Sequence, residues 1–331
     1  MKLKLAFRTI ISLSPCSHPL HLMRGLVIGL IGLAPFARAA TSDIVGFYPV
    51  NLPQGNSSWV CGLVAKDDFV GTASGVTTDS QGRAVVHFAG ESWEPGTFSL
   101  HTAEPQSGVC AGLGFDVLAH STNTLTLNTT PTAGGLTTGM SFSVRRHCTL
   151  GGLLPDGGGL VPLVDSITLF SSTGSQTPHF FNSTLNRWVD GEGNDRHDTV
   201  IPPARGMVIY ASQARTVMFG HGEVCYVKTT ASKVAVSARV PNIVGPINPL
   251  SANTTLGALG LTGTLQIFND SLVILDPGAL NQRGTYLYTG TSLIDGRGQN
   301  ANSVVLPTGA GVVINVDTAK NINLNAVQVQ P

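Results

Sequence analysis

Short runs of alternating apolar and polar residues fill the chain after residue 40. These runs are rich in β-branched and aromatic side chains, and Gly, Pro, Asn and Ser clusters bound them about every ten residues. Examples are residues 42–50, 84–88, 97–101, 115–119, 124–128 and 141–145. No segment there keeps a helical period for more than a turn or two. The pattern predicts an all-β protein built from sandwich or barrel sheets.

The second half of the chain contains an internal repeat. Residues 165–211 align with residues 270–316 at a constant offset of 105, without a gap, and 11 of the 47 positions are identical. Asp165-Ser166 falls on Asp270-Ser271, and an Asp-Gly-x-Gly sequence begins at both Asp190 and Asp295. A repeat of this kind predicts one small β module used twice.

Four segments follow from these patterns. We predict a signal peptide over 1–39, a small N-terminal β-barrel or sandwich domain over 41–149, and two tandem β modules over 150–240 and 241–331. Each module is small for an independent core, so we expect the two modules to pack against each other.

The N-terminus has the pattern of an export signal. Basic residues at 2, 4, 8 and 24 precede the short apolar run 26–33, and Ala37-Arg38-Ala39 gives a small-x-small cleavage pattern. Translation starting at Met23 in place of Met1 would give a signal of ordinary length. We expect cleavage near Ala39, no membrane span afterwards, and a location outside the cell, on the outer surface or in the periplasm. An uncleaved membrane anchor is the alternative interpretation.

Removal of the signal makes the protein acidic. Residues 1–39 hold five of the 19 basic residues and none of the 19 acidic ones, which leaves a formal charge near −5. Nucleic-acid binding is therefore not expected, because it needs a basic surface. The charged fraction of 11% is also well below the roughly 25% of ordinary soluble domains.

Four cysteines remain after residue 39. An even number in an exported chain predicts two disulfides, and we favour Cys61–Cys110 and Cys148–Cys225 among the three connectivities. Four buried free thiols are the alternative. The absence of CxxC spacing argues against a zinc or redox motif.

Several diffuse motifs give a resemblance to a known family. They are GESWEPGTF (90–98), SGVCAGLGFDVLAHSTNTLTL (107–127), GLTTGMSFSV (135–144), VDSITLF (164–170), IPPARGMVI (201–209) and PNIVGP (241–246). Together they resemble an uncharacterised family of exported β-rich bacterial proteins, found notably in Verrucomicrobia. The chain departs from that pattern at Thr138, where the family has an acidic turn residue, and in its four cysteines. The resemblance implies an exported β-protein and no particular activity.

Catalytic signatures do not assemble in the sequence. Ser74 lies one place too late in Gly71–Gly75 for a nucleophile elbow, and the histidines are scattered singly. Acidic residues at 67, 68, 91 and 94 lie near Trp93, and paired carboxylates could hydrolyse glycosides. We interpret them as turn residues around a core tryptophan, and we do not expect an enzyme.

One glycine-rich loop has the composition of a Ca²⁺ site. Hard cations prefer oxygen ligands, and the candidates here are Asp190, Glu192, Asn194 and Asp198. In the second module Arg297 replaces Glu192 and Ser303 replaces Asp198. Any calcium would therefore bind only one copy, and the shared residues are those of a tight turn.

Two functions of different class remain. The first is an exported, non-catalytic structural or adhesive protein of the cell surface or extracellular matrix, which associates with itself or a surface partner through sheet edges. The alternative is a secreted carbohydrate-binding, lectin-like protein that binds a polysaccharide. Its platform would be the aromatic rings of Trp59, Trp93 and Trp188, or those of Tyr286 and Tyr288.

Overall fold

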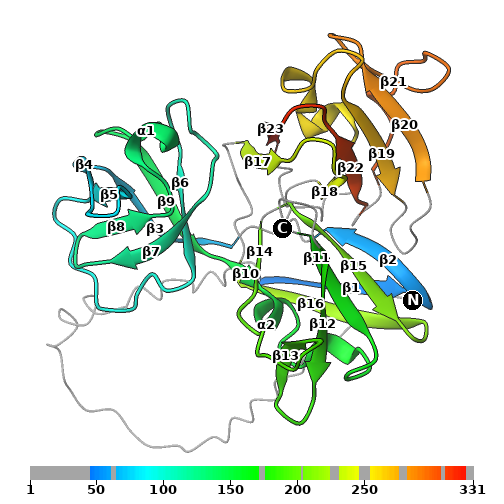
Figure 1. The fold of residues 1–331 in the computed structure, drawn as a ribbon, viewed down its shortest axis with the longest axis horizontal. Coiled ribbons are helices and arrows are strands. Elements are labelled where there is room, and N and C mark those ends of the chain that lie inside the picture. The colour runs from blue at the N-terminus through cyan, green and yellow to red at the C-terminus, as the bar shows by residue number, and fades with distance from the viewer. Residues whose placement is uncertain are drawn as a thin grey trace, which may run out of the picture. The chain divides into compact units, whose positions relative to one another are not determined.

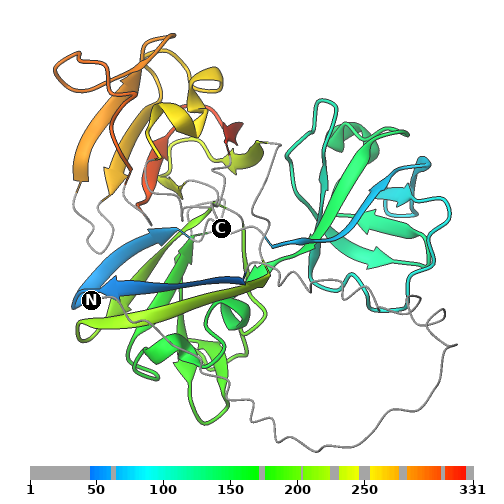
Figure 2. The same ribbon diagram turned by 180° about the vertical axis from the view of Figure 1, so that it is seen from behind.

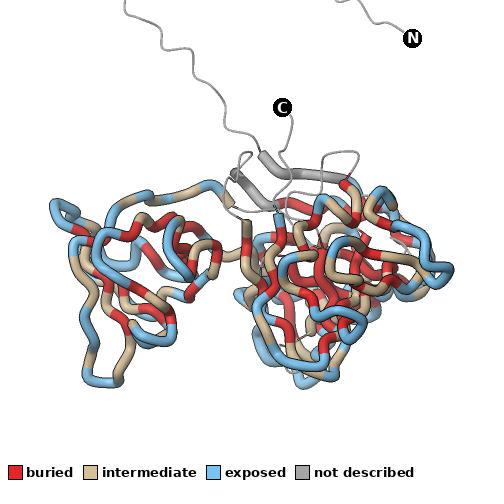
Figure 3. The backbone as a smooth tube through the Cα atoms, turned by 90° about the horizontal axis from the view of Figure 1, so that it is seen from above, coloured by how far each residue is buried: buried red, intermediate tan, exposed pale blue. Residues whose placement is uncertain are grey.

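Strands make up 49% of the structure and helices 7%, as expected of an all-β protein. The structure, a computed structural model, describes residues 45–60, 65–170, 176–202, 204–223, 231–245, 254–275, 282–306 and 310–325. The predicted signal peptide lies outside these residues. Buried stretches, red in Figure 3, alternate with exposed ones along the strands. The all-β prediction is confirmed.

Residues 65–147 form a curled sheet domain with its own core. The sheet order is β3 (Asp67–Thr72), β9 (Ser141–Arg146), β6 (His101–Pro105), β7 (Phe115–His120), β8 (Thr124–Leu127), β5 (Ala84–His87) and β4 (Gly75–Thr78). Strands β3 and β4 follow each other along the chain, so the sheet curls around its apolar side chains. Phe88, Leu125 and Phe142 are fully buried there. One short helix, α1 (Pro131–Gly134), is capped by the Thr130 side chain.

The strands on both sides of this domain in sequence form the first sandwich. Its five-stranded sheet has the order β13 (Arg187–Asp190), β12 (Gln176–Asn182), β11 (Ser166–Phe170), β15 (Gly206–Ala211) and β2 (Gly55–Val60). The shorter elements are β1 (Val45–Leu52) paired with β16 (Arg215–Glu223), β10 (Cys148–Thr149) paired with β14 (Val200–Ile201), α2 (Leu150–Leu153) and the 3₁₀ turn η1 (Gly157–Gly159). Both sheets contribute to one core around Trp188.

The second sandwich comprises β17 to β23. Its five-stranded sheet has the order β18 (Asn242–Val244), β22 (Val312–Asn315), β19 (Ser271–Leu275), β20 (Gln282–Tyr288) and β21 (Leu293–Ile294). A two-stranded sheet pairs β17 (Ser232–Val236) with β23 (Lys320–Leu324), and two 3₁₀ turns, η2 (Gly257–Leu259) and η3 (Leu261–Gly263), follow β18. Leu272, Ile314 and Ile322 are fully buried in its core.

Strands β1 and β2 pair with distant parts of the chain. The predicted N-terminal domain of 41–149 includes both strands, yet β1 pairs with β16 and β2 pairs with β15. Figures 1 and 2 show these blue strands beside the green ones from both sides. Similarly, β17 falls within the predicted module 150–240 but pairs with β23. The curled sheet domain is therefore an insertion between β2 and β10 of the first sandwich.

A fully buried aspartate holds the same position in each sandwich. Asp165 accepts hydrogen bonds from the N–H groups of Val161 (2.8 Å) and Ser212 (2.7 Å), and Arg215 lies 3.4 Å away. Each partner of Asp270 lies 105 residues later: the N–H of Gln266 (2.7 Å), the N–H of Asp317 (3.3 Å) and the Lys320 ammonium (2.5 Å). Each carboxylate therefore ties the start of one strand to the turn between two others.

The strand registers depart from the gap-free alignment at one hairpin. Ile167 pairs with Ile209, and Leu272 pairs with Ile314, which is the offset of 105 on both strands. On the other side Ile167 pairs with His179, whereas Leu272 pairs with Tyr286, an offset of 107. A shift of two residues keeps every side chain on its original face, because side chains alternate along a strand.

Substitution of either buried aspartate tests its structural role. We expect Asp165→Asn and Asp270→Asn each to lower the free energy of unfolding by roughly 3 kcal/mol, because each leaves a partly buried cation without its carboxylate. Urea unfolding followed by far-UV circular dichroism measures the change, because all three tryptophans lie outside the second sandwich. Asp317→Asn is the control, since that carboxylate is 56% exposed and should contribute little. Equal effects of all three changes would contradict the role.

Candidate functional site

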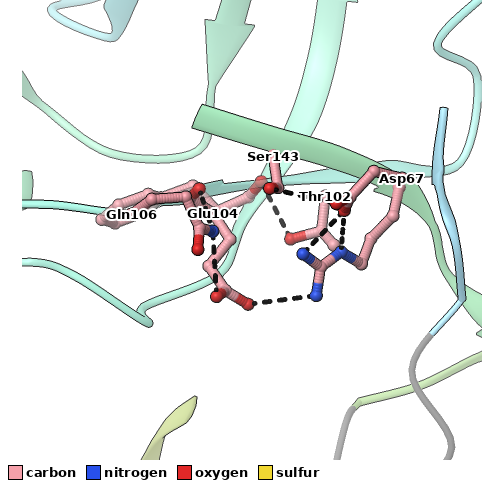
Figure 4. A network of polar contacts seen from close by, with 7 residues as sticks. Asp67, Thr102, Glu104, Gln106 and Ser143 are labelled. Carbon is pink, nitrogen blue, oxygen red and sulfur yellow. Dashed lines mark hydrogen bonds and ion pairs between the residues drawn. The ribbon is translucent and has the colours of Figure 1, made fainter. Parts of the chain in front are cut away.

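The candidate site is a buried polar network on the curled sheet domain (Figure 4). Side chains alternate along β9, so Phe142 and Val144 enter the core while Ser143 and Arg145 point to the other face. Ser143 and Arg145 are nevertheless only 5% and 4% exposed. A buried guanidinium requires charged or carbonyl partners, and here two carboxylates supply them.

Arg145 links three neighbouring strands. Its Nε and Nη2 atoms lie 2.9 and 2.7 Å from Asp67 Oδ1 on β3, and its Nη1 atom lies 3.5 Å from Glu104 Oε2 on β6. The Ser143 hydroxyl donates to Asp67 Oδ2 at 3.3 Å, and the Gln106 amide donates to Glu104 Oε1 at 3.2 Å. Figure 4 shows the guanidinium between the two acids. The network therefore cross-links β3, β9 and β6.

Two histidine–aspartate pairs border the network. His101 is 2% exposed, with Nε2 at 2.9 Å from Asp68 Oδ2 and Nδ1 at 2.6 Å from the Ser99 carbonyl. His147 Nε2 lies 3.2 Å from Asp116 Oδ1. Both nitrogens of His101 therefore lie against acceptor groups of the protein.

These contacts can cross-link neighbouring strands. General acid–base catalysis needs a group with a free site for the proton that it transfers. Each of the four carboxylates instead faces an arginine or histidine at 3.5 Å or less. The network resembles a fixed cross-link more than a catalytic pair.

The predicted calcium loop is closed by its own residues. Asp190 Oδ1 accepts the N–H groups of Glu192 and Asn194 at 3.0 and 2.9 Å. Its Oδ2 accepts the Asn194 amide at 3.1 Å and the Arg196 Nε at 3.0 Å. In the second sandwich Asp295 Oδ1 accepts the two equivalent N–H groups, those of Arg297 and Gln299. The shared aspartate therefore closes a turn in both places.

Calcium binding at this loop stays a prediction that the geometry does not favour. The Arg196 guanidinium already contacts Asp190 Oδ2, and in the described part of the chain Asp198 forms no hydrogen bond with Asp190, Glu192 or Asn194. Among the residues that the structure describes, no three His, Cys, Asp or Glu side chains converge as a metal site would require.

The cysteines are only partly visible. Cys110 is buried as a free thiol, with its Sγ 3.6 Å from the Gly135 carbonyl, and burial raises the pKa of this thiol. Cys148 is half-buried at the start of β10. Their predicted partners, Cys61 and Cys225, lie outside the described residues. No disulfide is seen in the described part of the chain.

The aromatic residues predicted as a sugar platform lie mostly in the cores. Trp188 is fully buried, and its indole N–H donates to the Leu154 carbonyl at 2.9 Å. Trp59, Tyr286 and Tyr288 are at most 8% exposed. Trp93 is half-buried, and it meets Phe69 and Phe98 edge to face. Sugar stacking needs an exposed ring face, which the four buried rings do not offer.

Sequence reasoning missed the Arg145 network. In the sequence, the acids at 67 and 68 suggest only an acidic cluster near Trp93, and Trp93 packs against the core. The one available signal was the pair of arginines at 145 and 146, next to each other at the end of a predicted strand. Adjacent strand residues face opposite sides, yet both positions are charged.

No protein-family model, curated protein or solved structure matches this chain. The helices in the described residues are single turns, and none is long and apolar enough to cross a membrane. A function for this chain therefore has to be proposed from its own sequence and structure.

The titration of Asp190 tests the turn. The Asn194 side-chain amide, helped by the N–H groups of Asn194 and Glu192 and by Arg196, lowers the pKa of Asp190 to about 2. The N–H groups of Gln299 and Arg297, together with the charge of Arg297, lower the pKa of Asp295. Carboxyl NMR should show Asp190 titrating below Asp295. The stabilisation of this turn is present above pH 4 and is lost as the pH falls toward 2. An Asp190 pKa of about 4 would contradict this geometry.

Removal of Arg145 tests the buried network. Arg145→Ala takes the cation from between two carboxylates, so we expect a loss of roughly 3 kcal/mol in the free energy of unfolding. Arg146→Ala is a matched control one residue away, because its side chain is 74% exposed and its ion pair with Asp68 spans 3.7 Å. It should cost less than about 1 kcal/mol. Chemical denaturation compares the two variants, and similar losses would show that the network adds no stability.

Proposed function

We propose that this chain is an exported, non-catalytic structural or adhesive protein of the cell surface or extracellular matrix. The observation that carries the proposal is the internal pairing of the candidate site. Arg145 holds Asp67 and Glu104, while His101 and His147 hold Asp68 and Asp116. A satisfied polar network of this kind stabilises a scaffold.

We infer that the two sandwiches are copies of one module. Support comes from their equal strand orders, β13-β12-β11-β15-β2 and β21-β20-β19-β22-β18, and from the equivalent partners of Asp165 and Asp270. A repeated scaffold that carries one inserted domain fits a structural or adhesive protein that presents a surface to a partner.

Export is part of the proposal. The pattern of residues 1–39 supports a signal peptide cleaved near Ala39, and the low charged fraction of 11% supports a life outside the cytoplasm. The resemblance to exported β-rich bacterial proteins points the same way.

Self-association has a structural candidate in the two-stranded sheets. In the described residues β1 and β16 pair only with each other, so this two-stranded sheet has strand edges available for pairing. Strand β17 pairs with β23 and also forms a single bridge from Lys233 to Leu113. Met218 on β16 is 52% exposed between the buried Val217 and Phe219. An apolar side chain at a sheet edge favours pairing with another copy.

Sedimentation of the mature protein tests assembly. We expect the sedimentation coefficient to rise with concentration, and Met218→Lys to shift the protein toward monomer, because a charge at a sheet edge opposes pairing. Leu185→Lys is the control, since Leu185 is 58% exposed in the turn between β12 and β13. A wild-type protein that stays monomeric at its highest soluble concentration would rule out the self-association version.

Cell fractionation tests export separately. A C-terminally tagged full-length protein should appear in the medium, outer membrane or periplasm, with an N-terminus at residue 40 by protein sequencing. Retention of the full chain in the cytoplasm would overturn the localisation.

A further inference from the structure

Arg205 is a buried cation without a carboxylate. It lies just before β15, is 9% exposed, and donates from its guanidinium to the Ala235 carbonyl. No carboxylate among the described residues forms an ion pair with it. Burial lowers the pKa of this guanidinium, which reflects the cost of a charge removed from water. Arg145, by contrast, is buried between two acids.

Arg205 lines a cavity of about 680 Å³. This volume is typical of small-molecule sites, which range over roughly 300–1,000 Å³. Lys233 also lines the cavity, and its ammonium contacts the Val109 carbonyl. The acids of the lining, Glu104 and Asp116, already face Arg145 and His147. The cavity therefore has an excess of positive charge.

The rest of the lining is suited to a hydroxylated molecule. Thr177, Thr199 and Ser232 carry hydroxyl groups, and Phe170 and Pro202 add apolar surface. A single inorganic anion would fill only a small part of this volume. The planar guanidinium matches a carboxylate in a two-point contact.

The second sandwich provides an internal comparison. The offset of 105 on β15 and β22 places Ala310 where Arg205 stands, and Arg196, another residue of the lining, corresponds to Ala301. Both alanines are at most 2% exposed. The fold therefore accommodates alanine at these positions, so Arg205 is not needed to build a sandwich.

We propose that this cavity binds a small hydroxylated carboxylate, of the kind found in a uronic acid, through Arg205 and Lys233. The carboxylate completes the partners of the buried guanidinium, and the sugar hydroxyls meet the threonine and serine side chains. This ligand site goes beyond the proposed structural role and does not depend on it. Glucuronate on its own and a short oligogalacturonate represent the two sources of such a group, a free sugar acid and a polysaccharide.

Calorimetric titration of the mature protein with these two compounds tests the proposal. We expect saturable binding of at least one, and no binding of glucose, which has the hydroxyls without the carboxylate. Arg205→Ala should weaken binding by at least about tenfold, since one charge-assisted contact is lost. Arg239→Ala removes the same charge from a side chain that is 81% exposed and does not line the cavity, and it should leave binding unchanged.

Thermal unfolding gives a second readout. Ligand should raise the Tm of the wild type and not that of Arg205→Ala, whose own Tm should stay level or rise because an uncompensated buried charge is gone. If that variant does not fold, Arg205→Met replaces it. The proposal is overturned if neither compound binds, if Arg205→Ala binds as tightly as the wild type, or if sulfate and phosphate bind as tightly as the sugar acids.

Discussion

Burial of the carboxylate of Asp165, and of Asp270 in the second sandwich, constrains the fold more than any other polar contact. A carboxylate with no exposure to water must find its hydrogen bonds and its countercharge within the protein. The donors come from three separate segments: the residue four positions earlier, the turn after β15 or β22, and the first residue of β16 or β23. They meet when β11 pairs with β15, or β19 with β22, and the next strand begins beside the carboxylate. The interaction thereby selects one strand arrangement among those that the apolar pattern alone would permit.

The curled sheet domain handles buried charge differently. There the cation is central, and Asp67 and Glu104 approach it from neighbouring strands. Only 11% of the residues of this chain are charged, and several of these form internal contacts of this kind. Arg205 is the contrasting case, since the described residues surround it with a carbonyl and a cavity.

Local patterns in the sequence predicted the strands and the tight turns well. The Asp-Gly-x-Gly turns at Asp190 and Asp295 need only the aspartate and its next four residues, so their pattern is complete in the sequence. Burial of Arg145 was not predictable in this way, because alternation along β9 places it on the face that is usually exposed. The same limit applied to β1 and β2, whose partners lie beyond an entire inserted domain. The offset of 107 on β20 was not visible in the alignment either, because a shift of two residues leaves every side chain on its original face.

The insertion between β2 and β10 has a consequence for the order in which the chain folds. The Asn51 side chain on β1 accepts a hydrogen bond from the Thr216 hydroxyl, 165 residues later. Closing so long a loop is slow, and β1 and β2 have no partners until β15 and β16 have been synthesised. The curled sheet domain, whose strands all lie between them, can complete its own sheet first and bring its two ends together. The inserted domain thus shortens the effective distance that the first sandwich must close. Strands β1 and β2, which wait for their partners, are the segment most exposed to aggregation while the chain emerges.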